Sequence, residues 1–356
     1  MKITGKNIGK NPMGSRTTSK ATMPSTIMPD RVVIKQIDET AEGQRIDNFL
    51  CKLLKGVPKS HIYQLLRSGQ VRVNSKRIVA SYHLQLADKV RIPPVSCKNN
   101  ILPVNFEKQM TQFPILFEDE NLLVVNKPAG IAVHGGSGIS HGVIEQLRIQ
   151  HPGWKFLELV HRLDRETSGI LLLAKKRQAL INLHQQIREG RVHKSYQVLV
   201  SGRWHNLIQN VKFPLNRYVT AAGERRVAVA GSNGKDEKIK SQQAHTIFCL
   251  QQNWDNFSLL SAELKTGRTH QIRVHLAHLG FPIAGDDKYG DFELNKQLRK
   301  NGQAVPLKRM FLHAEKFSCS HPLTNNRLLL EAPLAAELRL FLLSLGEPLN
   351  LVSVMK

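Results

Sequence analysis

The stretch HRLDRETSGILLLAK, residues 161–175, places one carboxylate, Asp164, between two guanidinium groups and then runs into an apolar segment. An unbroken apolar run of this length is typical of a strand that is buried on both faces. Asp164 would then lie in the loop before a central strand, where the sheet fixes a side chain but leaves it accessible. Neighbouring cations favour its ionised form. Such a carboxylate can act as a nucleophile or base, or can simply pair with an arginine to orient the loop.

The segments on either side extend this strand into a sheet. PILFEDENLLVVNKPAG, residues 114–130, predicts two strands joined by a turn and followed by a sharp loop. Apolar spacing predicts a helix ending at Gly190, a strand at 195–202, and a second helix at about residues 269–279. We therefore expect a mixed, largely antiparallel-sheet catalytic domain over residues 113–350.

Residues 31–95 carry the pattern of a smaller, separate unit. GQRIDNFLCKLL (43–54) and PKSHIYQLLRSG (58–69) each place apolar residues on one helical face, and the segments 70–74 and 88–94 alternate like short strands. The whole chain is therefore expected to be of the α+β class. This unit holds twelve Lys or Arg against five acids, which suits either a solvated face or RNA phosphates.

The charge of the whole chain points to a polyanionic partner. Lys and Arg total 51 against 28 acids, a net charge of +23 over 356 residues. Membrane attachment is the rival use of such charge, but no apolar run approaches the roughly 18 residues of a spanning helix. Nucleic acid is therefore the favoured partner, and we expect no membrane association.

The segment before the first unit and the segment between the two units are both polar. The first 29 residues carry five cations and no acid, so we expect a basic disordered arm over residues 1–30. A transit peptide shares this composition, but glycine and proline interrupt any amphipathic helix. Residues 96–112 are polar and show no hydrophobic periodicity, a pattern that predicts a linker. The four cysteines are scattered singly, which fits reduced thiols in the cytoplasm.

Two groups of segments resemble known RNA-directed proteins. Over residues 43–93, QRIDNFL, KSHIYQLLRSGQVRVN and DKVRI resemble the S4 RNA-binding domain in this order. HRLDRETSGILLLAKK closely resembles the signature of the RluA family of large-ribosomal-RNA pseudouridine synthases. The family's other segments lie in order within residues 115–335: NKPAGIAVHGG, KSYQVLV and LKTGRTHQIRVHLAHLGFPIAGDDKYG. The resemblance implies that structured RNA, 23S ribosomal RNA, is the partner and that its uridines are isomerised to pseudouridine.

The same resemblance implies roles for particular residues. Asp164 matches the catalytic aspartate of the family, Tyr196 the tyrosine that stacks on the target base, and Arg273 the basic residue that pairs with the aspartate. Arg162 matches the arginine that displaces the target base and fills its place. Val198 stands where the family more often has alanine, a detail of the core. Further candidates for RNA contact are Arg268, His270, Lys59, Arg67, Arg72 and Lys76.

The chemistry of this isomerisation sets what the protein must supply. The N1–C1′ bond breaks and a C5–C1′ bond forms with no redox change or group transfer, so we expect no cofactor. A carboxylate near C1′ can trap the cationic sugar, or can remove the 2′ proton in a glycal route, and both remain open. Flipping the nucleotide out of its stack costs a few kcal/mol, which aromatic and Arg contacts must offset.

Two other interpretations compete with this one. His270, His275 and His278 lie within nine residues, but their spacing does not put all three on one helical face, so no metal site is expected. A non-catalytic RNA-binding factor would fit the charge and the S4-like unit equally well. The combination of Asp164, Tyr196 and Arg273 favours the isomerase, which we expect to be a monomer.

Overall fold

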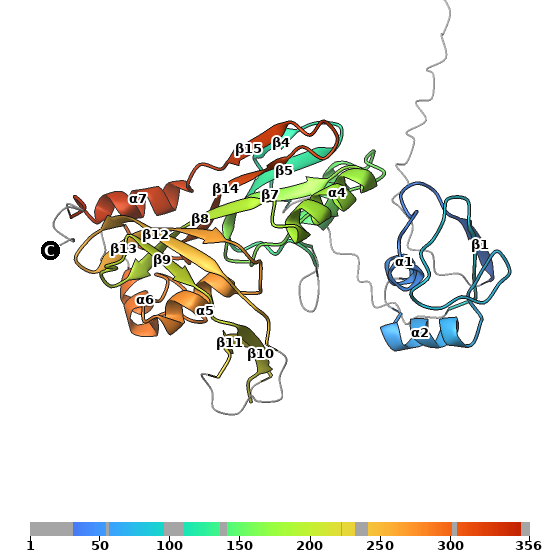
Figure 1. Cartoon of the computed structure of the whole chain (residues 1–356), viewed down its shortest axis with the longest axis horizontal. Helices are drawn as coiled ribbons and strands as arrows, with labels where there is room; N and C mark the ends of the chain where they lie inside the picture. The colour runs from blue at the N-terminus through green and yellow to red at the C-terminus, as the bar shows by residue number, and fades with distance from the viewer. Residues whose placement is uncertain are drawn as a thin grey trace, which may run out of the picture. The chain divides into compact units, whose positions relative to one another are not determined.

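The computed structural model divides the chain into two compact units, residues 1–101 and 102–356 (Figure 1). The described residues are 31–54, 57–95, 110–135, 141–221, 223–231, 241–300 and 305–349. The arm predicted over residues 1–30 and most of the predicted linker lie outside them. Within these ranges, no helix is long and apolar enough to cross a membrane.

The first unit joins two helices and a three-stranded antiparallel sheet through one apolar core. Helices α1 (Ile46–Leu53) and α2 (Lys59–Arg67) lie where the apolar spacing predicted them. The strands β1 (Val33–Gln36), β2 (Arg72–Val73) and β3 (Lys89–Ile92) are ordered β1-β3-β2. The sequence did not reveal β1, because a four-residue edge strand offers too little alternation. The core residues include Ile46, Leu50, Ile62, Leu65, Val71, Val90 and Ile92.

The second unit is built on a ten-stranded sheet with the order β4-β5-β7-β14-β8-β13-β12-β9, to which β15 adds beside β14 and β6 beside β7. All of its pairs are antiparallel except β7 with β14, so the predicted mixed, largely antiparallel sheet is confirmed. The strands are β4 (Ile115–Glu118), β5 (Leu122–Lys127), β6 (Glu158–Leu159), β7 (Ser168–Ala174), β8 (His193–Ser201), β9 (Ile208–Val211), β12 (Thr246–Asn253), β13 (Phe257–Leu264), β14 (Leu312–Ser320) and β15 (Arg327–Glu331).

Among the described residues, a two-stranded hairpin and five helices complete this unit. The hairpin consists of β10 (Leu215–Val219) and β11 (Arg225–Val229). The helices are α3 (Val143–Gln150), α4 (Arg177–Arg188), α5 (Gln271–His278), α6 (Phe292–Leu298) and α7 (Ala336–Ser344). Helix α4 packs on β7 and β14, whereas α5 packs on β11 and β12 (Figure 1). Both α4 and α5 lie within one or two residues of their predicted ends.

Strand β7 is buried along its whole length, as its apolar run predicted. Leu171 and Leu173 belong to a core that also contains apolar residues of α3. Ile170 and Leu172 belong to a second core, which contains apolar residues of α4. Because both faces of the strand are covered, every position from 170 to 174 is apolar rather than every second one.

The sheet splits along one edge of β7, and this split creates the site of Asp164. Strand β14 pairs with β7 only at Ser168 and Gly169, while β6 pairs with the opposite end of the same edge. The loop between β6 and β7, residues 160–167, therefore emerges between β7 and β14. The close approach requires a glycine: Gly169 has a φ of +110°, and a Cβ there would lie 2.2 Å from the Ala314 carbonyl oxygen.

We predict that Gly169→Ala destabilises the second unit by about 3 kcal/mol or more, because the new Cβ forces β7 and β14 apart at a positive φ. The urea midpoint of tryptophan fluorescence would measure this, since Trp154, Trp204 and Trp254 all lie in the second unit. Gly153→Ala is the control: no atom lies within 4 Å of its added Cβ, so a shift under about 0.5 kcal/mol is expected. Equal midpoints for the two variants would contradict the steric argument.

Candidate active site

An open cleft with a volume of about 900 Å³ lies where the β6–β7 loop meets the start of β8 and the segment leading into α5. The loop contributes Arg162 and Asp164, and β8 contributes Lys194 and Tyr196. Residues 264–273, which join β13 to α5, form the facing wall. Segments far apart in the sequence therefore meet around one carboxylate.

A buried lysine fixes the base of the β6–β7 loop. Lys127 is 0 % exposed, and its Nζ donates hydrogen bonds to the carbonyl oxygens of Pro128, Ile131 and Arg165 at 2.8, 2.8 and 3.0 Å. Burial lowers the pKa of Lys127 to about 7, a cost that three carbonyl acceptors offset. Gly130 N also donates to the Arg165 carbonyl, at 2.9 Å. The sharp loop after β5 thereby holds the loop that carries Asp164.

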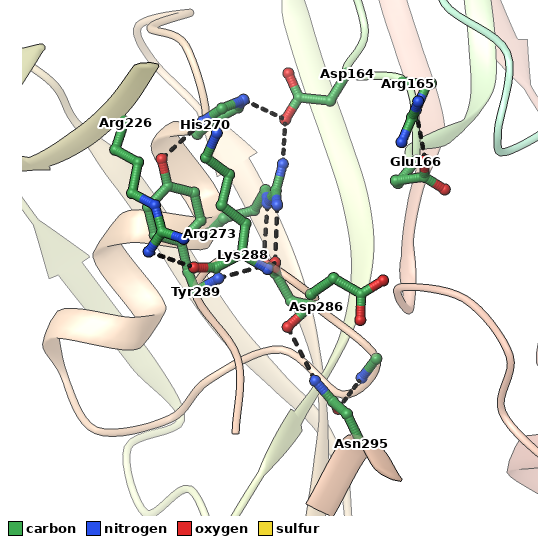
Figure 2. Close-up of polar contacts among 12 residues, drawn as sticks. Asp164, Arg165, Glu166, Arg226, His270, Arg273, Asp286, Lys288, Tyr289 and Asn295 are labelled. Carbon is green, nitrogen blue, oxygen red and sulfur yellow. Dashed lines mark hydrogen bonds and ion pairs between the residues drawn. The ribbon is translucent and has the colours of Figure 1, made fainter. Parts of the chain in front are cut away.

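The Asp164 carboxylate is partly exposed, at 27 %, and is contacted through one of its oxygens. Arg273 Nη1 donates to Asp164 Oδ2 at 3.2 Å, and His270 Nε2 lies 3.8 Å from the same atom. Arg162 and Arg165 flank Asp164 in the sequence. In the structure Arg165 is turned toward Glu166, with Nε 2.8 Å from Oε1 (Figure 2).

Arg273 is itself held by a second carboxylate. Its Nε and Nη2 each donate to an oxygen of Asp286 at 2.7 Å, while Nη1 remains for Asp164 (Figure 2). Burial alone would lower the pKa of Arg273, but the two carboxylates raise it overall, so the guanidinium stays charged. Its plane also lies over the ring of Tyr289, 5.1 Å from the centroid.

Asp286 is positioned by the turn that follows it. Its Oδ1 accepts hydrogen bonds from the backbone N–H groups of Lys288 and Tyr289 at 2.8 and 3.1 Å. The side chain of Asn295 braces the same turn, donating to the Asp286 carbonyl and accepting from Gly285 N (Figure 2). Burial raises the pKa of Asp286, but Arg273 and these backbone donors outweigh it and lower the pKa below 3.8.

Tyr196 lies on β8 at the base of the cleft. Its ring is 7 % exposed, and its cross-strand neighbours on both sides are alanines, Ala262 and Ala314. Burial, with the nearby charge of Asp164, raises the pKa of the Tyr196 phenol well above its usual value. The hydroxyl therefore remains protonated at neutral pH. The small neighbours give this ring room beside Asp164 in the cleft.

The three histidines of the segment before and within α5 have separate contacts. His270 Nδ1 lies 2.8 Å from the Tyr289 hydroxyl. His275 is buried between Thr246 Oγ1 and the Phe213 carbonyl, at 2.9 and 3.0 Å, and His278 packs edge-on against the Phe213 ring. Among the residues that the structure describes, no group of three or more His, Cys, Asp or Glu side chains is placed to hold a metal ion.

The remaining predicted contact residues are exposed cations. Arg162 and Arg268 line the cleft beside Asp164. Four exposed cations of the first unit lie on or just after α2: Lys59, Arg67, Arg72 and Lys76. None of these six side chains is drawn into a core, so all are available to solvent or to a partner.

Three residues of the site were not identified from the sequence. Asp286 and Tyr289 lie in GDDKYG, a family segment to which the resemblance assigns no role, and around Lys127 the sequence pattern indicates only a sharp loop. An acid and an aromatic in a conformationally restricted segment are a weak signal by themselves. Their importance depends on Arg273, thirteen residues before Asp286, and this contact becomes visible only in the folded chain.

Comparison with known proteins gives consistent matches over both units. The model of the S4 domain matches residues 44–90, and that of RNA pseudouridylate synthase matches residues 121–278. Ribosomal large subunit pseudouridine synthase C of Pasteurella multocida is 48% identical, covering 90% of this chain and 96% of that protein. The protein of that name from Haemophilus influenzae is 47% identical, with coverages of 90% and 97%. The solved structure of human RNA pseudouridylate synthase domain containing 1 shares the fold, with a TM-score of 0.52 and 24% identity, over 70% of this chain and all of that one.

The S4 domain and the mixed-sheet domain with its carboxylate cleft define an RNA-modifying enzyme rather than a binding module alone. The identity to full-length relatives extends over nine-tenths of the chain. The chain belongs to the RNA pseudouridylate synthase family, whose members isomerise uridine in RNA to pseudouridine.

We predict that Asp286→Asn lowers the free energy of unfolding of the second unit by about 3 kcal/mol at pH 7, because it removes one charge of a buried ion pair. The folded-state pKa of Asp286 is depressed below 3.8, so this contribution is present above about pH 4 and is lost as the pH falls through the lower folded value. The difference between wild type and variant should therefore shrink in acid. Urea unfolding between pH 3 and 7 measures it.

Asp287→Asn provides the matched control in the adjacent position. Asp287 is an exposed partner of Arg299, so its substitution should change the free energy by less than about 0.5 kcal/mol. A wild-type-like Asp286→Asn, or a difference that stays constant in acid, would contradict the role given to the buried pair.

Proposed function

We propose that this chain isomerises specific uridines of 23S ribosomal RNA to pseudouridine in the cytoplasm, with Asp164 as nucleophile or base. The supporting observation is the ion pair of Asp164 with Arg273 inside a cleft that also contains Tyr196. The choice of RNA is supported by the relatives named ribosomal large subunit pseudouridine synthase C, which match nearly their full length.

In the proposed reaction the N1–C1′ bond breaks, the uracil turns, and C5 bonds to C1′. The proton of C5 is lost and N1 gains one, so the product has the composition of the substrate. Arg273 keeps the Asp164 carboxylate oriented. The carboxylate then either bonds to C1′ as the N1–C1′ bond breaks and is displaced when C5 attacks C1′, or takes the 2′ proton to give a glycal and returns it as the C5–C1′ bond forms.

The other residues of the cleft are proposed to bind the flipped nucleotide. Tyr196 offers a ring for stacking on the uracil, which is worth about 1–3 kcal/mol per base in comparable contacts. Arg162 is proposed to occupy the space that the base leaves in the RNA. Arg268, at the cleft wall, is proposed to meet backbone phosphates.

The first unit is proposed to dock the enzyme through phosphate contacts. Its exposed cations follow α2 and the strand after it, which is the pattern of a surface that reads charge and shape rather than base sequence. It holds no candidate catalytic residue. Binding energy and chemistry would therefore be divided between the two units.

Asp164→Asn should reduce isomerisation at least about 10³-fold while RNA binding persists, because the amide keeps the shape but cannot attack or accept a proton. Tritium release from 5-tritiated uridine in a ribosomal RNA transcript measures turnover, and filter binding measures affinity. Glu166→Gln, in the same loop but paired with Arg165, should retain wild-type turnover. Appreciable release by the Asn variant would overturn the assignment.

Replacing four cations of the first unit with glutamine, at Lys59, Arg67, Arg72 and Lys76, should weaken binding to ribosomal RNA. Each lost phosphate contact should reduce the slope of log K against log salt by about 0.7 to 0.9. Turnover at saturating RNA should persist. A control with the same change in net charge replaces exposed cations of the second unit: Lys296, Lys316, Arg327 and Arg339. Equal slopes for the two variants would contradict docking by the first unit.

A further inference from the structure

A chain of polar contacts connects the β10–β11 hairpin to Asp164 (Figure 2). The backbone N–H of Val227, in β11, donates to the Tyr289 hydroxyl at 3.0 Å. That hydroxyl lies 2.8 Å from His270 Nδ1, and His270 Nε2 lies 3.8 Å from Asp164 Oδ2. Which nitrogen of His270 carries its proton depends on whether the Tyr289 hydroxyl donates to Nδ1 or accepts from it.

The Tyr289 hydroxyl has one proton to give and already accepts the N–H of Val227. Burial raises the pKa of Tyr289 to about 12, so the proton is retained. Burial also lowers the pKa of His270, outweighing the charge of Asp164, so the imidazole is neutral and has a single N–H. With Tyr289 donating to Nδ1, that N–H is on Nε2 and is directed toward Asp164.

The backbone holds His270 in this orientation at a cost. His270 has a φ of +54° and a ψ of 21°, the left-handed conformation, which costs a non-glycine residue about 1–2 kcal/mol. The preceding turn is braced by the buried side chain of Gln271, whose Oε1 accepts from Thr266 Oγ1 and Arg268 N at 2.8 and 3.0 Å. Asparagine or glycine would fit the conformation better, but neither reaches Asp164 with a donor.

The two oxygens of Asp164 are not equivalent in this arrangement. Oδ2 accepts from Arg273 and faces His270, whereas Oδ1 has no hydrogen-bond partner among the residues that the structure describes. Both routes of the proposed reaction need one oxygen that is free to meet the ribose. His270 Nε2, 3.8 Å from Oδ2, lies just beyond hydrogen-bond distance, and a shift of under about 1 Å would bring its N–H onto that oxygen. That second donor would limit rotation of a carboxylate that a single bond from Arg273 at 3.2 Å leaves loosely defined.

We propose that His270 and Tyr289 are positioning residues: with Arg273 they hold Asp164 through Oδ2 and present Oδ1 to the ribose. Tyr289 acts through His270 by fixing its tautomer, and Val227 of the hairpin completes the set of contacts. This inference rests on the proposed function of Asp164. It assigns His270 to orientation of the reacting carboxylate rather than to contact with RNA phosphate.

The first test compares His270→Gln with His270→Met. The two side chains have nearly the same length and shape and meet the same backbone strain, but only glutamine carries an N–H to the position of Nε2. We expect kcat for tritium release to fall roughly 100-fold in the Met variant, with at least roughly 10-fold recovered by Gln, at unchanged KM for RNA. Equal kcat values for Gln and Met would overturn the proposal. A raised KM with unchanged kcat would also overturn it, in favour of a phosphate contact.

The second test examines the tautomer directly. Tyr289→Phe keeps the ring over Arg273 and removes only the hydroxyl. In the wild type, ¹⁵N spectra of histidine-labelled protein should show His270 protonated at Nε2, and the Phe variant should show a mixture of tautomers with kcat reduced roughly 10-fold. His270 protonated at Nδ1 in the wild type would overturn the proposal. Full activity of Asp164→Asn would instead reject the proposed function itself, so the two failures are distinguishable.

Discussion

The guanidinium of Arg273, buried between Asp286 and Asp164, is the interaction on which this site depends. It joins three parts of the chain: the loop before β7, the helix α5, and the turn at residues 286–289. A buried charge is costly unless its partners are fixed, and here one carboxylate is held by two backbone N–H groups. Asp286 thus neutralises and aligns the arginine, which leaves Nη1 to donate to Asp164. The Asp164 carboxylate is therefore oriented by an arginine that is itself held on its other side.

A second constraint acts on the other side of the cleft. The sheet must split between β7 and β14 so that the loop carrying Asp164 can emerge, and yet the two strands touch at Gly169 and Ala314. Lys127 then holds the base of the β6–β7 loop, because its Nζ donates hydrogen bonds to three carbonyl oxygens. A glycine within a strand loses more backbone entropy on folding than other residues, and a buried ammonium is costly to desolvate. Their presence at the base of the loop indicates that the position of Asp164 is maintained at the expense of local stability.

Much of the fold could be predicted from periodicity. The run at residues 169–174 indicated a strand covered on both faces, and the apolar spacing located α1, α2, α4 and α5 closely. Short elements could not be predicted. Strands β1 and β6 have too few residues to show an alternation of apolar and polar residues, and β10 and β11 form a separate two-stranded sheet. The sequence also could not show that Arg165, next to Asp164, pairs with Glu166, because neighbours in sequence need not face one another in a loop.

The sequence by itself determined the two-unit organisation of the α+β chain, its strongly basic character, and, through the segment at 161–175, which carboxylate stands before the central strand. These features depend on the composition of the chain and on the order of neighbouring residues, which can be read directly from the sequence. Only the tertiary structure decided that Arg273 has two carboxylate partners, that His270 Nδ1 lies against the Tyr289 hydroxyl, and that Arg273 and His270 face the same oxygen of Asp164. Each of these results from side chains brought together from distant positions, and contacts at about 3 Å are fixed by how the sheet, the helix α5 and the turn pack, not by spacing along the chain.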